Sequence, residues 1–201
     1  MSFKANAAAS ISRGRRYLPD IALRKPFDLI KGVQGTYRLP KGKNIRFIPV
    51  PAALARKIDL QACTSQHFGG DPLDCHFGYI GSLFVAFFAN VRLTPETLLP
   101  CVGVVKEFEG MQIGRLLLGL TLAQAMLNGG GTRNILAGTA VRGFMKDLDH
   151  LAPLLGHTNV IRRIDAIEHR ISVFRSDTNQ QKKALKAIEK YLESAGICRI
   201  A

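Results

Sequence analysis

The sequence has no tryptophan and only four cysteines in 201 residues, and it contains neither low-complexity segments nor internal repeats. The cysteines are scattered and form no Cys-x-x-Cys pair. They therefore do not make a disulfide framework, and we expect the chain to work in a reducing compartment. The length and a hydrophobic content of 47% indicate one globular domain with appendages.

A membrane span and a secretory signal are also missing. The uncharged stretch 76–91 is shorter than the roughly 20 residues that a membrane-spanning helix needs, and glycines at 78 and 81 interrupt it. Two strands joined by a tight turn at Gly81-Ser82 explain it better. We therefore expect no membrane contact and a cytoplasmic location. Residues 1–16, rich in Ser, Ala and Arg and free of acidic residues, also fit an organelle transit peptide.

Cysteine and histidine come close together in the sequence at Cys63, His67, Cys75 and His76. Their spacing does not follow the common structural zinc patterns. The adjacent Cys75 and His76 would point to opposite faces of a strand. We therefore expect no metal site.

Acidic residues are scarce, with 15 Asp and Glu against 28 Lys and Arg. Residues 1–46 hold eleven of the basic residues but only Asp20 and Asp28, so this segment supplies +9 of the total charge of +13. A basic arm before a nearly balanced domain is typical of a contact with nucleic acid, in which Lys and Arg neutralise phosphates and release counterions. The alternative is a solvated extension without a partner.

The hydrophobic pattern predicts alternating strands and helices from residue 44 onward. Strands are predicted at 44–50, 98–105 and 134–139, with hairpins at 76–91 and at 159–174. Helices are predicted at 51–63, 114–127 and 144–155. His169 and Arg170 are expected at an exposed strand edge. An amphipathic helix at 178–195 follows, whose apolar stripe is expected to dock on the domain; a second copy of the chain, as in a homodimer, could also take that face.

Residues 104–118 indicate a buried strand that passes through a glycine-bearing turn into a helix. The first N–H groups of a helix have no intrahelical partners and carry partial positive charge, so such a junction is suited to hold a phosphate. Glycine after a strand also occurs as plain turn chemistry. The pattern alone leaves both interpretations open.

This loop resembles the acyl-CoA pyrophosphate loop of the GCN5-related N-acetyltransferases (GNAT), Arg/Gln-x-x-Gly-x-Gly/Ala followed by Leu-Leu. Gly114 matches the last glycine, whereas Glu109 replaces the first Arg/Gln and Gln112 replaces the middle glycine. The order of the predicted elements is also similar to that superfamily over residues 44–175. Segments 67–70 (His-Phe-Gly-Gly) and 108–111 (Phe-Glu-Gly-Met) resemble a phage and mobile-element branch, with Mom-type DNA-modification proteins as a more distant relation.

The resemblance implies an α/β fold with a mixed, mostly antiparallel central sheet flanked by helices. It divides the chain into a basic N-terminal arm (1–43), a GNAT-like acyltransferase domain (44–175) and a packed C-terminal helix (176–201). It further implies acetyl transfer from acetyl-CoA to an amine, at a notch between the fourth and fifth strands. Main-chain groups of Val104 and Val105 would hold the pantetheine arm. The pyrophosphate would meet the N–H groups of Met111, Gln112, Ile113, Gly114 and Arg115.

The sequence indicates the catalytic acid and base less clearly than the cofactor loop. Many members of the superfamily use a tyrosine shortly before the glycine that ends the fourth helix, but here Ala152 stands at that position. His67, which can titrate near neutral pH, is the best candidate for the base. Tyr79 and Asp71 lie near enough in sequence to share the acceptor pocket. Local packing is the alternative role for each of the three.

We therefore expect an acyl-CoA-dependent N-acyltransferase. One alternative is a Mom-like enzyme that modifies a nucleobase in DNA on the same scaffold, which suits the basic arm. The other is a non-enzymatic nucleic-acid-binding or virion-associated protein that keeps the fold while the altered loop no longer holds CoA.

Overall fold

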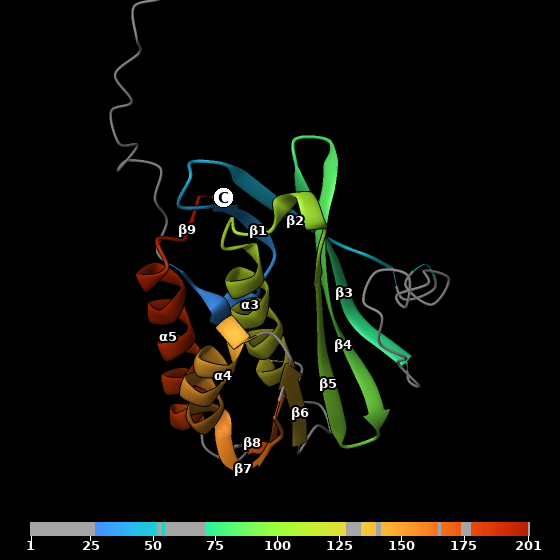
Figure 1. Cartoon of the computed structure of the whole chain (residues 1–201), viewed down its shortest axis with the longest axis vertical. Coiled ribbons are helices and arrows are strands. Elements are labelled where there is room, and N and C mark those ends of the chain that lie inside the picture. Colours follow the sequence, from blue (N-terminus) through green and yellow to red (C-terminus); the bar gives the residue numbers. More distant parts are fainter. Residues whose placement is uncertain are drawn as a thin grey trace, which may run out of the picture.

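The computed structural model describes residues 27–51, 54, 71–127, 134–139, 142–164, 166–173 and 178–200. Within these ranges the chain forms one sheet, and three α-helices pack on the sheet and on one another (Figure 1). The helices are α3 (Ile113–Leu127), α4 (Arg142–Leu155) and α5 (Thr178–Ser194), with short 3-10 helices η2 (Leu29–Lys31) and η3 (Lys106–Phe108). The strands are β1 (Gly35–Arg38), β2 (Asn44–Pro49), β3 (Asp71–Ile80), β4 (Leu83–Thr94), β5 (Thr97–Val104), β6 (Asn134–Thr139), β7 (Gly156–Arg162), β8 (Ile167–Val173) and β9 (Cys198–Arg199).

The sheet has the order β7-β8-β6-β5-β4-β3-β2-β1-β9, and every neighbouring pair is antiparallel except β5 and β6. This confirms the predicted fold class. β5 and β6 run parallel because α3 returns the chain between them, as a crossover connection requires. Their ladder consists of only two pairs, Thr97 with Asn134 and Leu98 with Ile135. The remainder of β5 is therefore paired on its β4 side alone.

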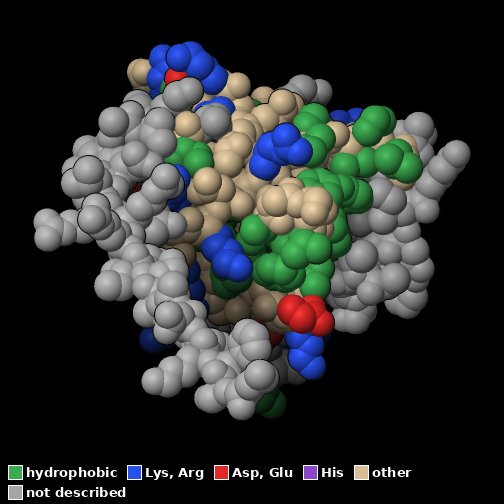
Figure 2. Space-filling model, turned by 90° about the horizontal axis from the view of Figure 1, so that it is seen from above, with side chains coloured by type: hydrophobic (Ala, Val, Ile, Leu, Met, Phe, Trp, Pro, Cys, Tyr) green, Lys and Arg blue, Asp and Glu red, His purple; other side chains and the backbone are tan. Residues whose placement is uncertain are grey.

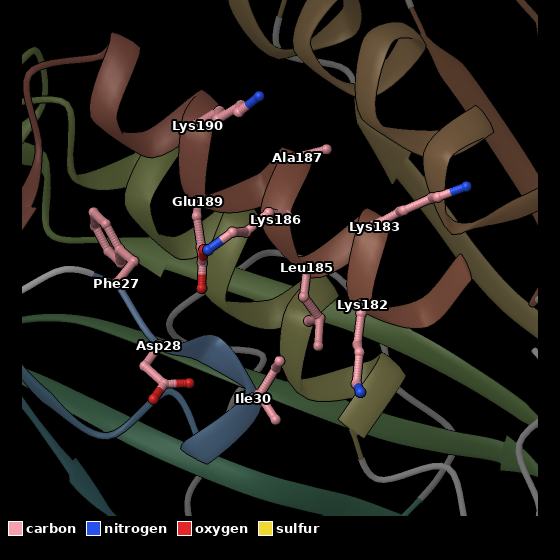
Figure 3. A pocket seen from close by; sticks show the side chains of 10 residues that line it. All are labelled: Phe27, Asp28, Ile30, Lys182, Lys183, Leu185, Lys186, Ala187, Glu189 and Lys190. Atoms are coloured by element: carbon pink, nitrogen blue, oxygen red, sulfur yellow. The ribbon is translucent and has the colours of Figure 1, made fainter. Parts of the chain in front are cut away.

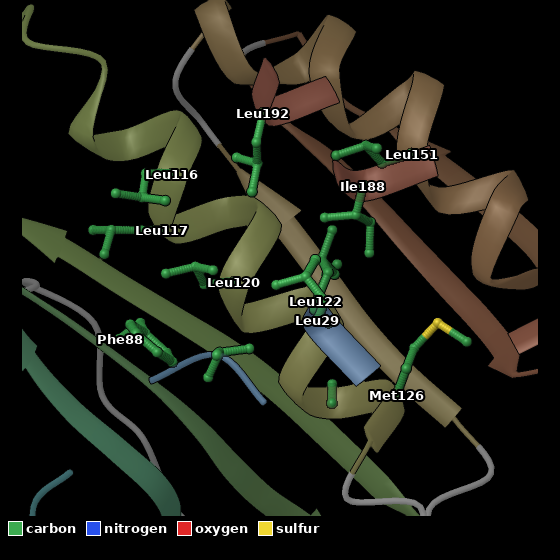
Figure 4. Packing of buried hydrophobic residues seen from close by; sticks show 14 of the residues in the cluster. Leu29, Phe88, Leu116, Leu117, Leu120, Leu122, Met126, Leu151, Ile188 and Leu192 are labelled. Carbon is green, nitrogen blue, oxygen red and sulfur yellow. The ribbon is translucent and has the colours of Figure 1, made fainter. Parts of the chain in front are cut away.

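Helix α3 is the best-buried element of the described chain. Its buried residues occur on nearly all sides rather than on one stripe. The reason is that α3 lies between the sheet, at β4 and β5, and helix α5 (Figures 1 and 4). Gly119 makes the contact with α5 possible, because a Cβ there would lie 2.9 Å from Leu192 Cδ2. No helix in the described ranges is long and apolar enough to span a membrane.

Residues 27–43, which were expected to belong to the basic arm, are part of the sheet and the core. From Phe27 onward the chain belongs to the domain: β1 pairs with both β2 and β9, and Tyr37 is fully buried, with its hydroxyl donating to Val33 O at 2.7 Å. Composition concealed this because exposed lysines at 41 and 43 accompany the buried apolar residues. Strand β9, which completes this end of the sheet, was not predicted. The helix expected at 51–63 falls almost entirely outside the described residues.

His169 is not at an exposed strand edge, which corrects the expectation. Strand β8 lies between β6 and β7, and His169 is 1% exposed. Its Nε2 lies 3.0 Å from Asp149 Oδ1 and its Nδ1 lies 3.0 Å from Thr158 Oγ1. An ionised carboxylate only accepts, so Nε2–H donates to Asp149 and the neutral Nδ1 accepts from the Thr158 hydroxyl. Arg162 also donates to Asp149, at 2.9 Å.

Burial should keep His169 neutral in the folded protein. Loss of water lowers its pKa below the ordinary 6.5, against the smaller raising effect of Asp149. The unfolded chain then binds a proton that the folded chain does not, so the free energy of unfolding should fall as the pH drops from about 7 to about 5. Urea unfolding across this range measures the effect. His169→Gln should flatten the dependence; an unchanged slope in this variant would contradict the assignment.

Candidate functional site

The candidate site lies where β5 ends and α3 begins. After Val104 the chain makes the short helix η3, passes through an extended Glu109 and turns at Gly110, which has a φ of 75°. Helix α3 starts at Ile113. The predicted strand, glycine turn and helix are therefore present. The structure defines the directions of the main-chain groups, which sequence alone did not.

Gln112 has a φ of 66° and is the single non-glycine residue with positive φ in the described ranges. It occupies the position at which the acyl-CoA pyrophosphate loop has its middle glycine. A side chain in this conformation costs on the order of 1 kcal/mol relative to glycine. Gln112 thus takes a left-handed conformation that is better suited to glycine. Strained backbone of this kind is found most often at ligand-binding loops and active sites.

The turn at Gln112 leaves a set of N–H groups at the start of α3. Leu116 N donates to Gln112 O at 3.2 Å, which is the first hydrogen bond of the helix. The N–H groups of Ile113, Gly114 and Arg115 precede it and have no acceptor within the helix. Together with the helix dipole they form a suitable site for a phosphate.

Gly114 is enclosed by a neighbouring helix. A Cβ at this position would lie 2.2 Å from Cζ of Phe144, so the ring of α4 packs directly on the α3 backbone. In the sequence, Gly114 matches the last glycine of the resembled pyrophosphate loop. The structure supplies a separate reason, because any side chain at Gly114 must displace Phe144. Substitution of Gly114 would therefore disturb helix packing as well as any ligand.

Arg115 is held by an ion pair. Its Nε lies 3.1 Å from Asp147 Oδ2, and the Asp147 side chain is only 14% exposed. Burial, followed by the charge of Asp147, raises the pKa of Tyr191 on α5. The Arg115–Asp147 pair thus connects α3 to α4 beside the loop. Sequence reasoning found Arg115 but missed Asp147, which comes from a helix far away in the chain.

Beside this loop, one edge of β5 has no strand paired with it among the described residues. Val105 N donates to Val85 O at 2.9 Å, which makes these two residues a hydrogen-bonded pair. In an antiparallel ladder such pairs alternate, so Val104, opposite Ala86, directs its N–H and C=O away from β4. Val102, opposite Phe88, does the same. Of the two predicted pantetheine residues, Val104 therefore faces the opening with its main chain, whereas the N–H of Val105 is already used; Val102 was missed.

The predicted acid and base residues are not assembled around the loop by the described contacts. His67 lies outside the described residues. Asp71 begins β3 opposite Arg92. Tyr79 belongs to an aromatic group at the β3–β4 hairpin, with its ring centroid 6.0 Å from that of Phe84. The β3–β4 hairpin lies at the end of the molecule that Figure 2 shows from above, where hydrophobic side chains gather on the surface.

Thiol and metal chemistry find little support in the described residues. Burial raises the pKa of Cys75 to about 11 and that of Cys101 to about 12, so both remain protonated near neutral pH. In the described part of the chain no three His, Cys, Asp or Glu side chains are grouped to hold a metal ion. Cys63 and His67 lie outside that part.

No protein-family model matches the sequence, and no curated protein matches it. Similar solved structures include the GNAT domain of PAT from S. lividans, which is 13% identical, with 70% of this chain and 97% of that chain covered and a TM-score of 0.46. A GNAT family acetyltransferase from Elizabethkingia anophelis with acetyl-CoA bound is 12% identical over 64% and 98% of the chains, with a TM-score of 0.42. Escherichia coli ElaA is 15% identical over 64% and 99%, with a TM-score of 0.43. Likenesses this distant do not assign an activity.

If Gln112 is strained, replacing it with glycine should stabilise the fold. Gln112→Gly should raise the free energy of unfolding by about 0.5–1 kcal/mol, because glycine adopts this φ at no steric cost. Gln112→Ala is the matched control, since it removes the same side chain but keeps the strain. Chemical denaturation of the three proteins measures the difference. Equal stability of the Gly and Ala variants would show that the turn is relaxed.

Proposed function

We propose that this chain is an acyl-CoA-dependent N-acyltransferase that transfers an acetyl group from acetyl-CoA to an amine. The observation that carries the proposal is the left-handed backbone of Gln112, at the glycine position of the resembled loop and one residue before α3. A left-handed residue next to right-handed ones turns successive N–H groups toward one point, which is an arrangement that binds anions. This supports a phosphate as the ligand of the loop.

The main chain supplies most of what the reaction needs. The N–H groups of Ile113, Gly114 and Arg115 would hold the pyrophosphate, and the open edge of β5 at Val102 and Val104 would pair with the pantetheine arm. The acyl thioester would then lie where β5 and β6 are no longer paired. Arg115 would contribute mainly through its N–H, because its guanidinium is paired with Asp147.

The transfer itself is one substitution at the acyl carbon. The nitrogen of the acceptor amine forms a bond to this carbon, the carbon–sulfur bond breaks, and the leaving thiolate takes a proton. The acceptor arrives as an ammonium ion and must first lose a proton to a base. Holding the thioester and the amine in contact supplies much of the rate enhancement, and N–H donors near the carbonyl oxygen stabilise the oxyanion.

The charge distribution favours a second candidate for the acceptor. Residues 1–46 carry +9, which suits a nucleic acid as the molecule that presents the amine, as in Mom-like modification of a nucleobase. Only the choice of acceptor differs between the two candidates, since the loop, the thioester and the open edge of β5 are the same. Both require CoA to bind at the start of α3.

Binding of CoA can be tested with a charge at the loop. The Gln112 side chain is exposed, so Gln112→Glu adds a carboxylate beside the phosphate site without displacing Phe144. Calorimetry should show CoA binding by the wild-type protein and a loss of affinity on the order of tenfold in the variant. Asn159→Asp on β7 is the control, because it adds the same charge on an exposed residue away from the loop. Absence of CoA binding by folded wild-type protein would overturn the proposal.

His67 remains our proposed base, with Tyr79 and Asp71 as candidate residues of the acceptor pocket. His67→Ala should lower turnover by on the order of 10²-fold while CoA affinity stays near that of the wild type. His157→Ala, at an exposed position of β7, is the matched control and should retain activity. If the pH–rate profile is the same in His67→Ala and in the wild type, His67 is not the base and has a packing role.

A further inference from the structure

An open groove of about 730 Å³ lies between η2 and α5 (Figure 3). None of the described residues that line it belongs to the β5–α3 loop. Four lysines of α5 line it, namely Lys182, Lys183, Lys186 and Lys190. Of its apolar residues, Phe27 and Leu185 are buried, whereas Ile30 of η2 is 54% exposed. A partner on this surface would therefore meet four lysines beside the exposed Ile30 side chain.

The acidic residues of the groove are already engaged. Glu189 Oε1 accepts the N–H of Leu29 at 3.0 Å, and its other oxygen lies 3.6 Å from Lys186 Nζ. Asp28 is paired with Lys31 at 2.8 Å. Lys182, Lys183 and Lys190 are exposed and have no carboxylate partner among the described residues. Among the described residues, the groove therefore carries a net positive charge.

The spacing of the lysines concentrates this positive charge on one side of α5. Lys182, Lys186 and Lys190 follow one another at intervals of four residues, which places them on one side of α5 over roughly 12 Å of helix axis. Like charges at this interval destabilise a helix. Their repetition on one face is thus unfavourable for the isolated helix. An extended partner with regularly spaced negative charge would remove that cost.

We propose that the four lysines of α5 bind the phosphate backbone of a nucleic acid. The charge of the rest of the chain supports this occupant. Residues 1–26, which precede Phe27 in the sequence, contain six Lys and Arg and one Asp and so carry +5. The total charge of +13 has the same sign. Such contacts follow the phosphates and are independent of base sequence.

The experiment compares two triple variants of the full chain on a duplex of about 20 base pairs. Lys182→Gln, Lys183→Gln and Lys190→Gln together remove three charges from the groove. Arg92→Gln, Lys146→Gln and Arg163→Gln together remove three exposed charges outside both α5 and residues 1–46 and form the control. Circular dichroism confirms that both variants remain folded. Affinity is measured by fluorescence anisotropy over a range of salt concentrations, with polyglutamate as a competing polyanion.

We expect the α5 variant to bind about tenfold more weakly than the wild type at roughly 0.1 M salt, with the slope of log K against log salt reduced by about 2. The control variant should change affinity less than about twofold. Equal losses of affinity in the two variants would show that only the total charge matters and would overturn the proposal that α5 is the binding site. Stronger binding to polyglutamate than to the duplex, or no binding to the duplex, would overturn the choice of nucleic acid.

Discussion

The burial of α3 between the sheet and α5 is the constraint on which the candidate site depends. The helix packs on β4 and β5 with one side and against α5, at Gly119, with another. Because Ile113, its first residue, is itself buried, the packing that holds the helix also sets the direction of its first N–H groups. Those groups are useful for a phosphate only when their direction is fixed. The hydrophobic core thereby orients a polar site at its own edge.

The left-handed turn at Gln112 follows from the same packing. Strain of about 1 kcal/mol persists where the surrounding structure determines the backbone. Here the surroundings are β5, which is paired with β4 up to Val104, and α3, which is buried from its first residue.

The proposed α5 site depends on a different kind of interaction. Its lysines attract phosphate by charge over several ångströms, whereas main-chain N–H groups require a fitted position.

The helices and strands predicted correctly are those whose limits depend on the pattern of neighbouring residues. The strands at 134–139 and in the 76–91 hairpin, and helix 114–127, followed from apolar periodicity and turn residues. Errors arose where the outcome depended on distant partners. His169 was placed at a strand edge because its neighbours β6 and β7 could not be ordered from the sequence. Residues 27–43 were assigned to an arm because the burial of Tyr37 involves β9, almost at the other end of the chain.

Neighbouring residues in the sequence are enough to indicate where the loop lies and where positive charge gathers. They also indicate that Gln112 stands at the position of the middle glycine of the resembled loop. Tertiary structure alone decided that Gln112 is left-handed, that Val104 rather than Val105 faces the open edge of β5, and that Arg115 is paired with Asp147. It also decided that Lys186 is paired with Glu189, whereas Lys182, Lys183 and Lys190 have no carboxylate partner among the described residues. The physical reason is that ladder register and ion pairing join groups far apart in the chain, whose distances only the packed core sets.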